Sequence, residues 1–137
     1  MARFTKWTRP KIVEGKLTKY NWMVQNVKGF KMGSKTDIGA FAYINAQEGV
    51  TIEDDVQIGS HCSIYSVSTI DNKKGPVHIK SGACIGSHSM IMPGVTVGEG
   101  AICGAFSFIN KDIPAGAVAY GVPVRIVKRN KDASRTK

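Results

Sequence analysis

The fold is decided by the stretch IKSGACIGSHSMIMPGVTVGEGAICGAFSFIN, which runs from Ile79 to Asn110. Within it an aliphatic residue or a cysteine recurs at every sixth position, namely Ile79, Ile85, Ile91, Val97, Cys103 and Ile109. A helix has a period of 3.6 residues and a strand alternates every two, so neither produces this spacing. A six-residue repeat predicts short strands and turns wound into a parallel β-solenoid.

The same repeat extends toward the N-terminus. It begins near Met32 and Ile38, slips by about two residues around 44–47 and resumes at Ile52. Three hexads make one triangular coil, so every third hexad is expected on the same wall of the solenoid. This count predicts three walls, formed by Ile64, Ile85 and Cys103; by Ile58, Ile79 and Val97; and by Ile52, Ile70, Ile91 and Ile109.

Two positions of each hexad are expected to face the core. The first is the aliphatic residue itself. The fifth is inward and small, as in Val56, Cys62, Ala83, Ser89 and Val95. The third and fourth positions lie at corners, which explains Pro93–Gly94 there.

One interruption of the repeat indicates a loop. Nine positions rather than six separate Ile70 from Ile79, and the inserted residues 71–76 are polar and turn-forming. A solenoid extrudes insertions on one face, which is often the binding face. We therefore expect an N-terminal cap or subunit-contact segment at 1–31, a solenoid at 32–113 with its loop at 71–76, and a C-terminal segment with a basic tail at 114–137.

Composition limits the partners and the compartment. The formal net charge is +9, from 19 Lys and Arg against 10 Asp and Glu, and the cations gather at both ends of the 137-residue chain. No aromatic residue interleaves with the C-terminal basic run, so no nucleic-acid partner is expected. The three cysteines fit no metal-ligand spacing and favour a reducing, cytoplasmic location. No membrane span or secretory signal is expected.

Residues from Ile38 to about Lys128 resemble the hexapeptide-repeat acyltransferases, in particular the galactoside and other sugar acetyltransferases. The segment IGSHSMIMPGVTVG at 85–98 is similar to the main signature of that family. The segment GAFSFINKDIP at 104–114, followed by GVPVRI at 121–126, is similar to its C-terminal signature. The resemblance implies an all-β, left-handed parallel β-helix that assembles as a homotrimer.

The resemblance also implies that acetyl-CoA is the acyl donor and lies in a groove between two subunits. Eight residues match the family's CoA-binding positions: Gly86, Ser87, Gly104 and Ala105 along the pantetheine, Asn110 and Lys111 near the adenosine, and Arg125 and Lys128 at the phosphates. Glycine lets a ligand approach the backbone closely, and cations bind phosphates through charge-assisted hydrogen bonds. For the glycines the competing explanation is a structural need of the turns, and for the cations it is a solvated surface.

The catalytic base departs from the family pattern. Many members carry a histidine before or inside the extruded loop, whereas this chain has Thr69 at about that place. By the wall count, His88 lies one coil beyond Thr69 on the same wall, and His61 occupies the same slot on another wall. His88 and Asp71 are therefore the catalytic candidates, and Thr69, Asn72 and Lys73 are expected to contact the acceptor.

Three functions are compatible with these residues. The first is acetyl transfer to an amino or hydroxyl group of a sugar or nucleotide-sugar, and the missing loop histidine favours an amine, which needs less help from a base. The second is a metalloenzyme similar to the γ-class carbonic anhydrases, but His61, His78 and His88 lack the spacing for a shared zinc ion. The third is a non-catalytic or degenerate trimeric scaffold. No metal is expected for the first and third functions.

Overall fold

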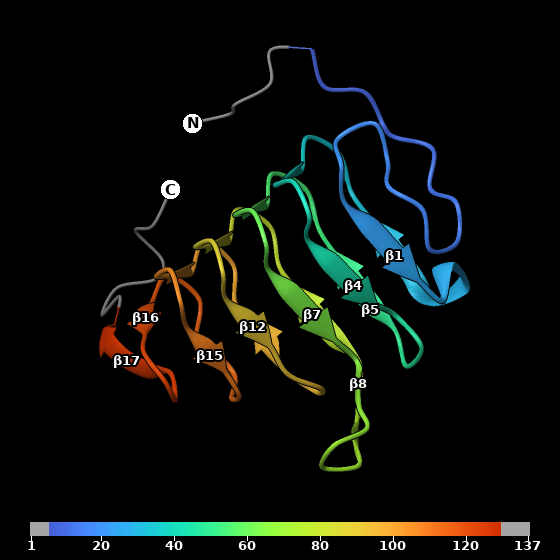
Figure 1. Cartoon of the computed structure of the whole chain (residues 1–137). Helices are drawn as coiled ribbons and strands as arrows, with labels where there is room; N and C mark the ends of the chain where they lie inside the picture. Colours follow the sequence, from blue (N-terminus) through green and yellow to red (C-terminus); the bar gives the residue numbers. More distant parts are fainter. Residues whose placement is uncertain (1–5, 130–137) are drawn as a thin grey trace.

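The computed structural model describes residues 6–129, which wind into a parallel β-solenoid (Figure 1). Three walls of short parallel strands run along its axis, and we number them in the order in which the chain visits them. Wall 1 contains β1 (Met23–Gln25), β4 (Tyr43–Asn45), β7 (Ser63–Tyr65), β12 (Met90–Ile91) and β15 (Phe108–Ile109). A short 3-10 helix, η1 (Val27–Gly29), links β1 to the second wall.

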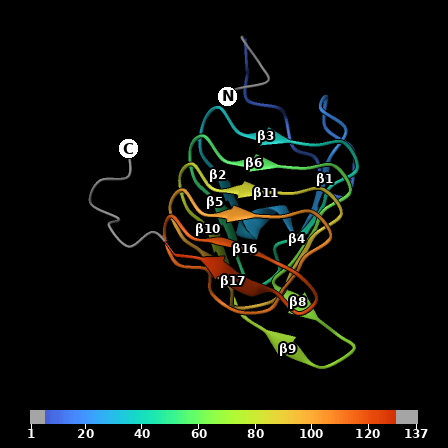
Figure 2. The same ribbon diagram turned by 90° about the vertical axis from the view of Figure 1, so that its left-hand side faces the viewer.

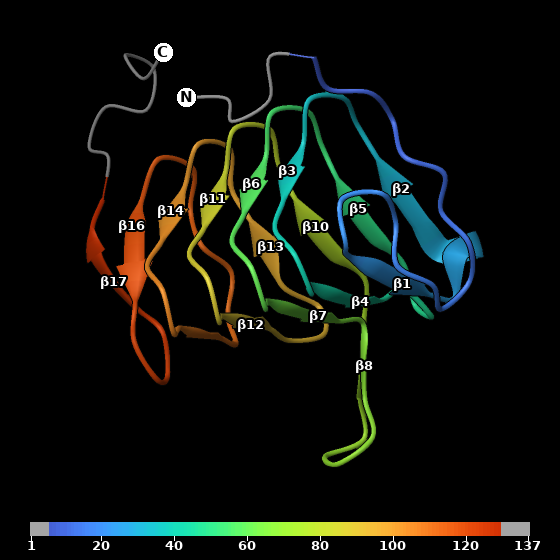
Figure 3. The ribbon, with the colours of Figure 1, turned by 45° about the horizontal axis from the view of Figure 1, so that its top comes forward.

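The other two walls follow the same pattern (Figure 3). Wall 2 contains β2 (Phe30–Met32), β5 (Val50–Ile52), β10 (Val77–Ile79) and β13 (Thr96–Val97). Wall 3 contains β3 (Asp37–Ile38), β6 (Gln57–Ile58), β11 (Cys84–Ile85), β14 (Ile102–Cys103) and β16 (Val118–Tyr120), with β17 (Arg125–Lys128) added antiparallel to β16. The all-β parallel solenoid predicted from the hexad is confirmed.

The core is a column of small and aliphatic side chains. On wall 1, strand pairing stacks Ile44, Ile64, Ile91 and Ile109, and all four are fully buried. The five small residues expected to face inward at the fifth hexad position are also buried. Since each coil buries its inward residues against the coils on either side, stability accumulates from neighbouring coils.

The assignment of hexads to walls is wrong after Ile64. The observed register stacks Ile64 with Ile91 and Ile109, Ile52 with Ile79 and Val97, and Ile58 with Ile85 and Cys103. Ile70 is the cause, because it fits the six-residue spacing but is 98% exposed and takes no part in the core. Counting it as a coil position shifts every later hexad by one wall.

Ile70 instead belongs to a hairpin that leaves the solenoid between wall 1 and wall 2. Its strands β8 (Val67–Ser68) and β9 (Lys73–Lys74) pair antiparallel and project away from the coils (Figure 2). The excursion is longer than the loop expected at 71–76, because the pairing already begins at Val67.

Both ends of the solenoid lie outside the expected limits of 32–113. The first coil begins at β1, which pairs in parallel with β4, and the last coil reaches β16 on wall 3. Before β1, the chain covers the N-terminal end of the solenoid, where Trp22 is buried. Residues 130–137 of the expected basic tail lie outside the described residues. Within 6–129 no helix is both long and apolar enough to span a membrane.

Candidate active site

A buried serine anchors the hairpin to the solenoid. The Ser66 hydroxyl donates to the carbonyl oxygen of Asn45 at 2.7 Å and accepts from the Glu48 amide at 2.9 Å. On the returning strand, the Gly75 amide donates to the carbonyl oxygen of Ser66 at 3.0 Å. A Cβ atom on Gly75 would lie 3.0 Å from the backbone of Gly94, so glycine lets the hairpin pass close to the next coil. These contacts determine where the hairpin leaves the solenoid.

The hairpin presents all of its predicted site residues to solvent, namely Thr69, Asp71, Asn72 and Lys73. A hydrogen bond from the Ser68 side chain is the main cause that lowers the pKa of Asp71 below its ordinary value of 3.8, and the charge of Lys73 contributes less. The Lys73 ammonium lies 3.9 Å from the Asp71 carboxylate. A carboxylate with a lowered pKa is a weak proton acceptor. Asp71 is therefore better suited to hold or orient a polar group than to remove a proton.

The corner between wall 3 and wall 1 carries a stack of four exposed rings, which we call the ring corner: Phe41, His61, His88 and Phe106. The rings of His61 and His88 lie parallel, 4.8 Å apart at an interplanar angle of 2°. Phe106 stacks on His88 at 5.0 Å, and Phe41 lies 5.5 Å from His61 at a tilt of 43°. The prediction that His61 and His88 lie on different walls is therefore wrong, and so is the prediction that His88 shares a wall with Thr69.

Backbone geometry explains why the rings stack. All four residues have positive φ angles, between 59° and 64°, in the left-handed region that bulky residues rarely adopt. The amides of His61, His88 and Phe106 each donate to a carbonyl of the preceding coil at 3.0 Å. The turn is thus repeated once per coil, and its side chains superpose.

The ring corner and the hairpin lie on opposite edges of wall 1. His88 comes just before β12 of that wall, whereas the hairpin follows β7. One chain therefore does not bring His88 and Asp71 together.

Four of the predicted CoA-binding residues lie at the start of the ring corner. Gly86–Ser87 and Gly104–Ala105 occupy the same place in successive coils, because β11 pairs with β14. A Cβ atom on Gly86 would lie 2.4 Å from the amide nitrogen of Ala105. Close packing of the coils therefore requires glycine at position 86, whether or not a ligand binds.

This architecture and these residues agree with comparisons to known proteins. The chain is 36% identical over 123 residues to galactoside O-acetyltransferase of Escherichia coli, which covers 77% of this chain and 60% of that protein. A hexapeptide-repeat acetyltransferase from Vibrio cholerae, solved with acetyl coenzyme A, superposes with a TM-score of 0.74 at 26% identity, covering 81% of this chain and 66% of that one. A galactoside acetyltransferase solved with coenzyme A gives a TM-score of 0.73 at 26% identity, covering 85% and 62%.

The chain is therefore similar to the hexapeptide-repeat acyltransferases over most of its length. The predicted left-handed parallel β-helix is the fold of these relatives and is confirmed. No protein-family model matches the chain. The chain spans 60% of the length of the galactoside O-acetyltransferase it matches.

The remaining CoA-binding candidates of this hexapeptide-repeat chain are spread over two places. Asn110 and Lys111 are exposed after β15, where the chain turns from wall 1 toward wall 2. Arg125 and Lys128 are exposed on β17 at the C-terminal end of wall 3. The structure thus brings four of the eight candidates together at the ring corner and leaves the other four apart from them.

Sequence reasoning missed a polar patch on the outer face of wall 1, beside the base of the hairpin. The Tyr43 hydroxyl donates to Gln25 Oε1 at 2.5 Å, and Asn26 Nδ2 donates to Asn45 Oδ1 at 3.1 Å. The Tyr43 and Tyr65 rings lie 5.8 Å apart. The available signal was strand alternation, since Tyr43, Asn45 and Tyr65 flank the inward residues Ile44 and Ile64.

Histidine geometry also bears on the metalloenzyme alternative. Parallel rings such as those of His61 and His88 cannot both direct a nitrogen lone pair at one ion. His78 lies on wall 2, where its Nε2 is 2.5 Å from Glu53 Oε2. Hydrogen bonds from His78 and then from the Ser81 amide lower the pKa of Glu53. Among residues 6–129 no three His, Cys, Asp or Glu side chains are grouped so that they could hold a metal ion.

Proposed function

We propose that this chain is an acetyl-CoA-dependent acetyltransferase that acetylates an amino or hydroxyl group of a sugar or nucleotide-sugar. The observation that carries the proposal is the pairing of the Gly86–Ser87 and Gly104–Ala105 turns in a chain 36% identical to a galactoside O-acetyltransferase. Relatives of the same fold were solved with acetyl coenzyme A or coenzyme A. The donor would lie along the ring corner of one copy, with Arg125 and Lys128 of that copy at its nucleotide end, and Asn110 and Lys111, which share an edge with the hairpin, would reach it from the neighbouring copy.

We place the active site between two copies of a cytoplasmic homotrimer. The support is the separation of the catalytic candidates, because His88 and Asp71 lie on opposite edges of wall 1 in one chain. A neighbouring copy that presents its hairpin to the ring corner would complete the site. Such a head-to-tail contact, repeated by a threefold axis, gives three equivalent sites.

In the proposed reaction the acceptor nitrogen or oxygen attacks the thioester carbon. A C–N or C–O bond forms, the C–S bond breaks, and CoA leaves as its thiolate. His88 takes the proton of the acceptor and returns it to the thiolate, because a neutral imidazole nitrogen accepts a proton and the resulting imidazolium donates it. The Asp71 carboxylate orients the acceptor through a neighbouring hydroxyl or ammonium group.

The acceptor would lie between the hairpin and the patch on wall 1. Thr69, Asn72 and Lys73 supply donors from the hairpin, while Tyr43 and Asn45 supply donors and acceptors from the wall. Polar groups on two sides of a pocket suit a ligand with several hydroxyl groups. These residues support a sugar as the acceptor.

A non-catalytic trimeric scaffold is the second candidate function. The observation in its favour is Thr69, which stands where many family members carry the loop histidine. A scaffold of this kind would retain the CoA groove without turnover.

The test is a screen of the purified chain with acetyl-CoA and a panel of galactosides, amino sugars and nucleotide-sugars. We expect acetyl-CoA to raise the melting temperature, and release of the CoA thiol with at least one acceptor. Stabilisation by acetyl-CoA without thiol release on any acceptor would favour the scaffold. The absence of both stabilisation and thiol release would contradict both functions.

A further inference from the structure

The N-terminal end of the solenoid carries eight exposed cations, which we call the cationic cap: Lys6, Arg9, Lys11, Lys16, Lys19, Lys28, Lys31 and Lys35. Between residues 6 and 35 the sequence has one acidic residue, Glu14. Its carboxylate accepts hydrogen bonds from the amides of Val27 and Asn26 at 2.9 and 2.7 Å, which lower the pKa of Glu14. Glu14 is thus engaged with the backbone. Asp54 of the next coil also lies beside the cap and accepts a hydrogen bond from the Ser34 amide at 2.7 Å. The eight cations outnumber these acids, so the cap is positive.

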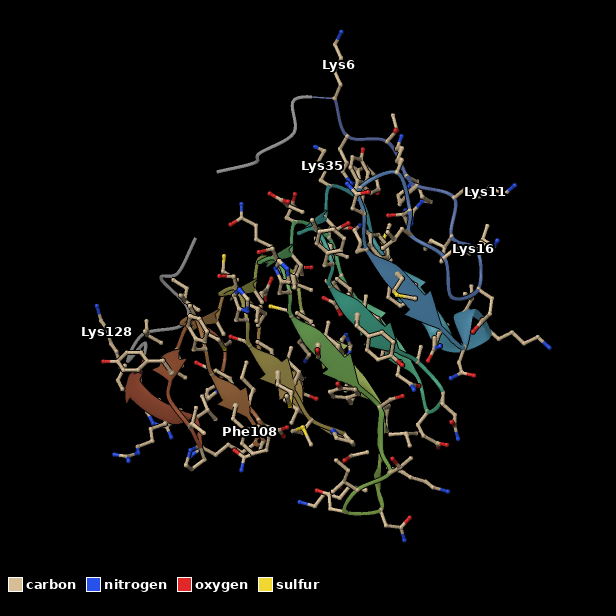
Figure 4. The ribbon with its side chains drawn as sticks, in the orientation of Figure 1. Lys6, Lys11, Lys16, Lys35, Phe108 and Lys128 are labelled. Carbon is tan, nitrogen blue, oxygen red and sulfur yellow. The ribbon has the colours of Figure 1, made fainter. Side chains whose placement is uncertain are left out.

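Most of these cations point into solvent. Figure 4 shows the side chains of Lys6, Lys11 and Lys16 extending away from the ribbon at this end of the molecule. Within residues 6–129, neither of the two ion pairs, Lys73–Asp71 and His78–Glu53, involves the cap. The charges of cap lysines such as Lys6, Lys11 and Lys16 are therefore available to a partner.

Exposed apolar side chains sit among the cations. Residues 13–16 form a tight turn, in which the Lys16 amide donates to the Val13 carbonyl at 3.0 Å and Gly15 has a φ of 67°. Val13 is 42% exposed and Leu17 is 51% exposed on either side of that turn. Lys11, Lys16 and Lys19 are their neighbours in the chain. The turn thus presents aliphatic side chains within a positively charged surface.

The aromatic rings at 6–35 are buried or partly buried. The Arg9 guanidinium lies 5.6 Å from the centre of the Trp7 ring, and the Lys19 ammonium lies 5.2 Å from the Tyr20 ring. Trp22 is 1% exposed. Proteins that bind single-stranded nucleic acid stack bases on exposed rings. Among residues 6–35 no aromatic ring is fully exposed, so the charge there does not favour nucleic acid.

We propose that the cationic cap docks this protein on a membrane surface rich in anionic lipids, with Val13 and Leu17 entering the interface. Clustered lysines are attracted to anionic lipid headgroups, and nearby apolar side chains add buried area. A symmetric contact between the caps of two copies would bring their cations together, so like-charge repulsion disfavours a second copy as the partner. The inference goes beyond acetyl transfer and does not depend on it.

The expected effects follow from charge and area. Each lysine near an anionic surface contributes about 1 kcal/mol, so removing two of them weakens binding about 30-fold. Burial of one leucine side chain contributes enough that Leu17→Ser weakens binding about 10-fold. The electrostatic part falls with added salt, whereas the leucine part does not.

The experiment is co-sedimentation of the full chain with vesicles of phosphatidylcholine, with and without phosphatidylglycerol. We expect binding only to the anionic vesicles, a loss of about 30-fold in K11Q/K16Q, and a loss of less than about threefold in the charge-matched control K74Q/K80Q. Leu17→Ser is expected to weaken binding about 10-fold without changing its salt dependence. Melting temperatures with and without acetyl-CoA check that each variant folds, and they test acetyl-CoA binding separately from lipid binding.

Several outcomes would overturn the proposal. Equal binding to neutral and anionic vesicles, or equal losses in the two double variants, would remove the electrostatic basis. Binding of a single-stranded oligonucleotide at physiological salt without vesicle binding would assign the cap to nucleic acid. A change in the sedimentation coefficient of Leu17→Ser with unaltered vesicle binding would assign the turn to a contact between copies.

Discussion

The two edges of wall 1 differ in how strictly they follow the repeat. At the ring corner every coil makes the same turn, and the side chains of four coils superpose with spacings near 5 Å. At the other edge the third coil leaves the solenoid as a hairpin held by Ser66 and Gly75. Under the proposed function, the extended donor lies along the regular edge and the acceptor meets the hairpin at the irregular edge. Acetyl transfer needs both.

The largest expected effect concerns His88, since the proposed difference between the two edges of wall 1 requires His88 to act as the base at the ring corner. His88→Gln is expected to lower kcat about 100-fold or more, because removal of a general base has effects of this size. His61→Gln, one coil earlier in the same stack, is the control and should leave kcat within about threefold. The two variants are compared by CoA release, with melting temperatures to check folding. Equal losses of kcat in the two variants would show that the stacked rings have a structural role and that His88 is not the base.

Regular packing at the ring corner predicts a large effect on stability. A Cβ atom on Gly59 would lie 2.4 Å from the Ser87 amide nitrogen, so Gly59→Ala is expected to destabilise the protein by about 3 kcal/mol. Gly100 has a φ of 68° and open space around its Cα, so Gly100→Ala should cost about 1 kcal/mol. Urea denaturation measures both. Equal losses would show that backbone conformation, and not coil contact, sets the requirement for glycine.

At the hairpin edge we expect a smaller loss of stability than at the ring corner. Ser66→Ala removes the acceptor of the Glu48 amide and is expected to destabilise the protein by about 1–2 kcal/mol. Ser63→Ala, on the solvent-facing side of β7, should change stability by less than about 0.5 kcal/mol. Limited proteolysis within 67–75 should accelerate only in the first variant. Unchanged cleavage there would mean that Ser66 does not anchor the hairpin.

The smallest effect concerns the charge of Asp71. The folded pKa of Asp71 is lowered, so its contribution to stability is present above pH 3.8 and lost as the pH falls through the folded pKa. Ser68→Ala removes the main cause, and the Asp71 midpoint followed by NMR should move back toward 3.8. An unmoved midpoint would assign the shift to Lys73 or to the backbone.

The regular parts of the molecule were predictable from the sequence, because the inward positions of the hexad are periodic and apolar. Ile44, Ile64, Ile91 and Ile109 follow that rule and are buried. The same rule failed at Ile70, whose spacing is right but whose surroundings are polar. A local repeat does not record where the chain leaves the solenoid, and one miscounted isoleucine moved His88 to the wrong wall.

The site was harder to predict than the fold because it combines coils that are distant in sequence. Strand pairing, and not spacing, puts Tyr43 and Asn45 beside Tyr65 at the base of the hairpin. The resemblance to the family supplied the CoA-binding candidates. The structure adds that Gly86 is required by the approach of Ala105 even without a ligand. Glycine at this position is therefore weak evidence of binding by itself.

The central claim is that one active site uses the ring corner of one copy and the hairpin of another. Mixed oligomers of His88→Gln and Asp71→Asn test it most directly, purified by two different tags after coexpression. Each variant alone should be nearly inactive in CoA release. If the two residues come from different copies, each mixed trimer restores one of its three sites, so about a third of the sites are active. Mixed oligomers no more active than their parents would contradict the claim.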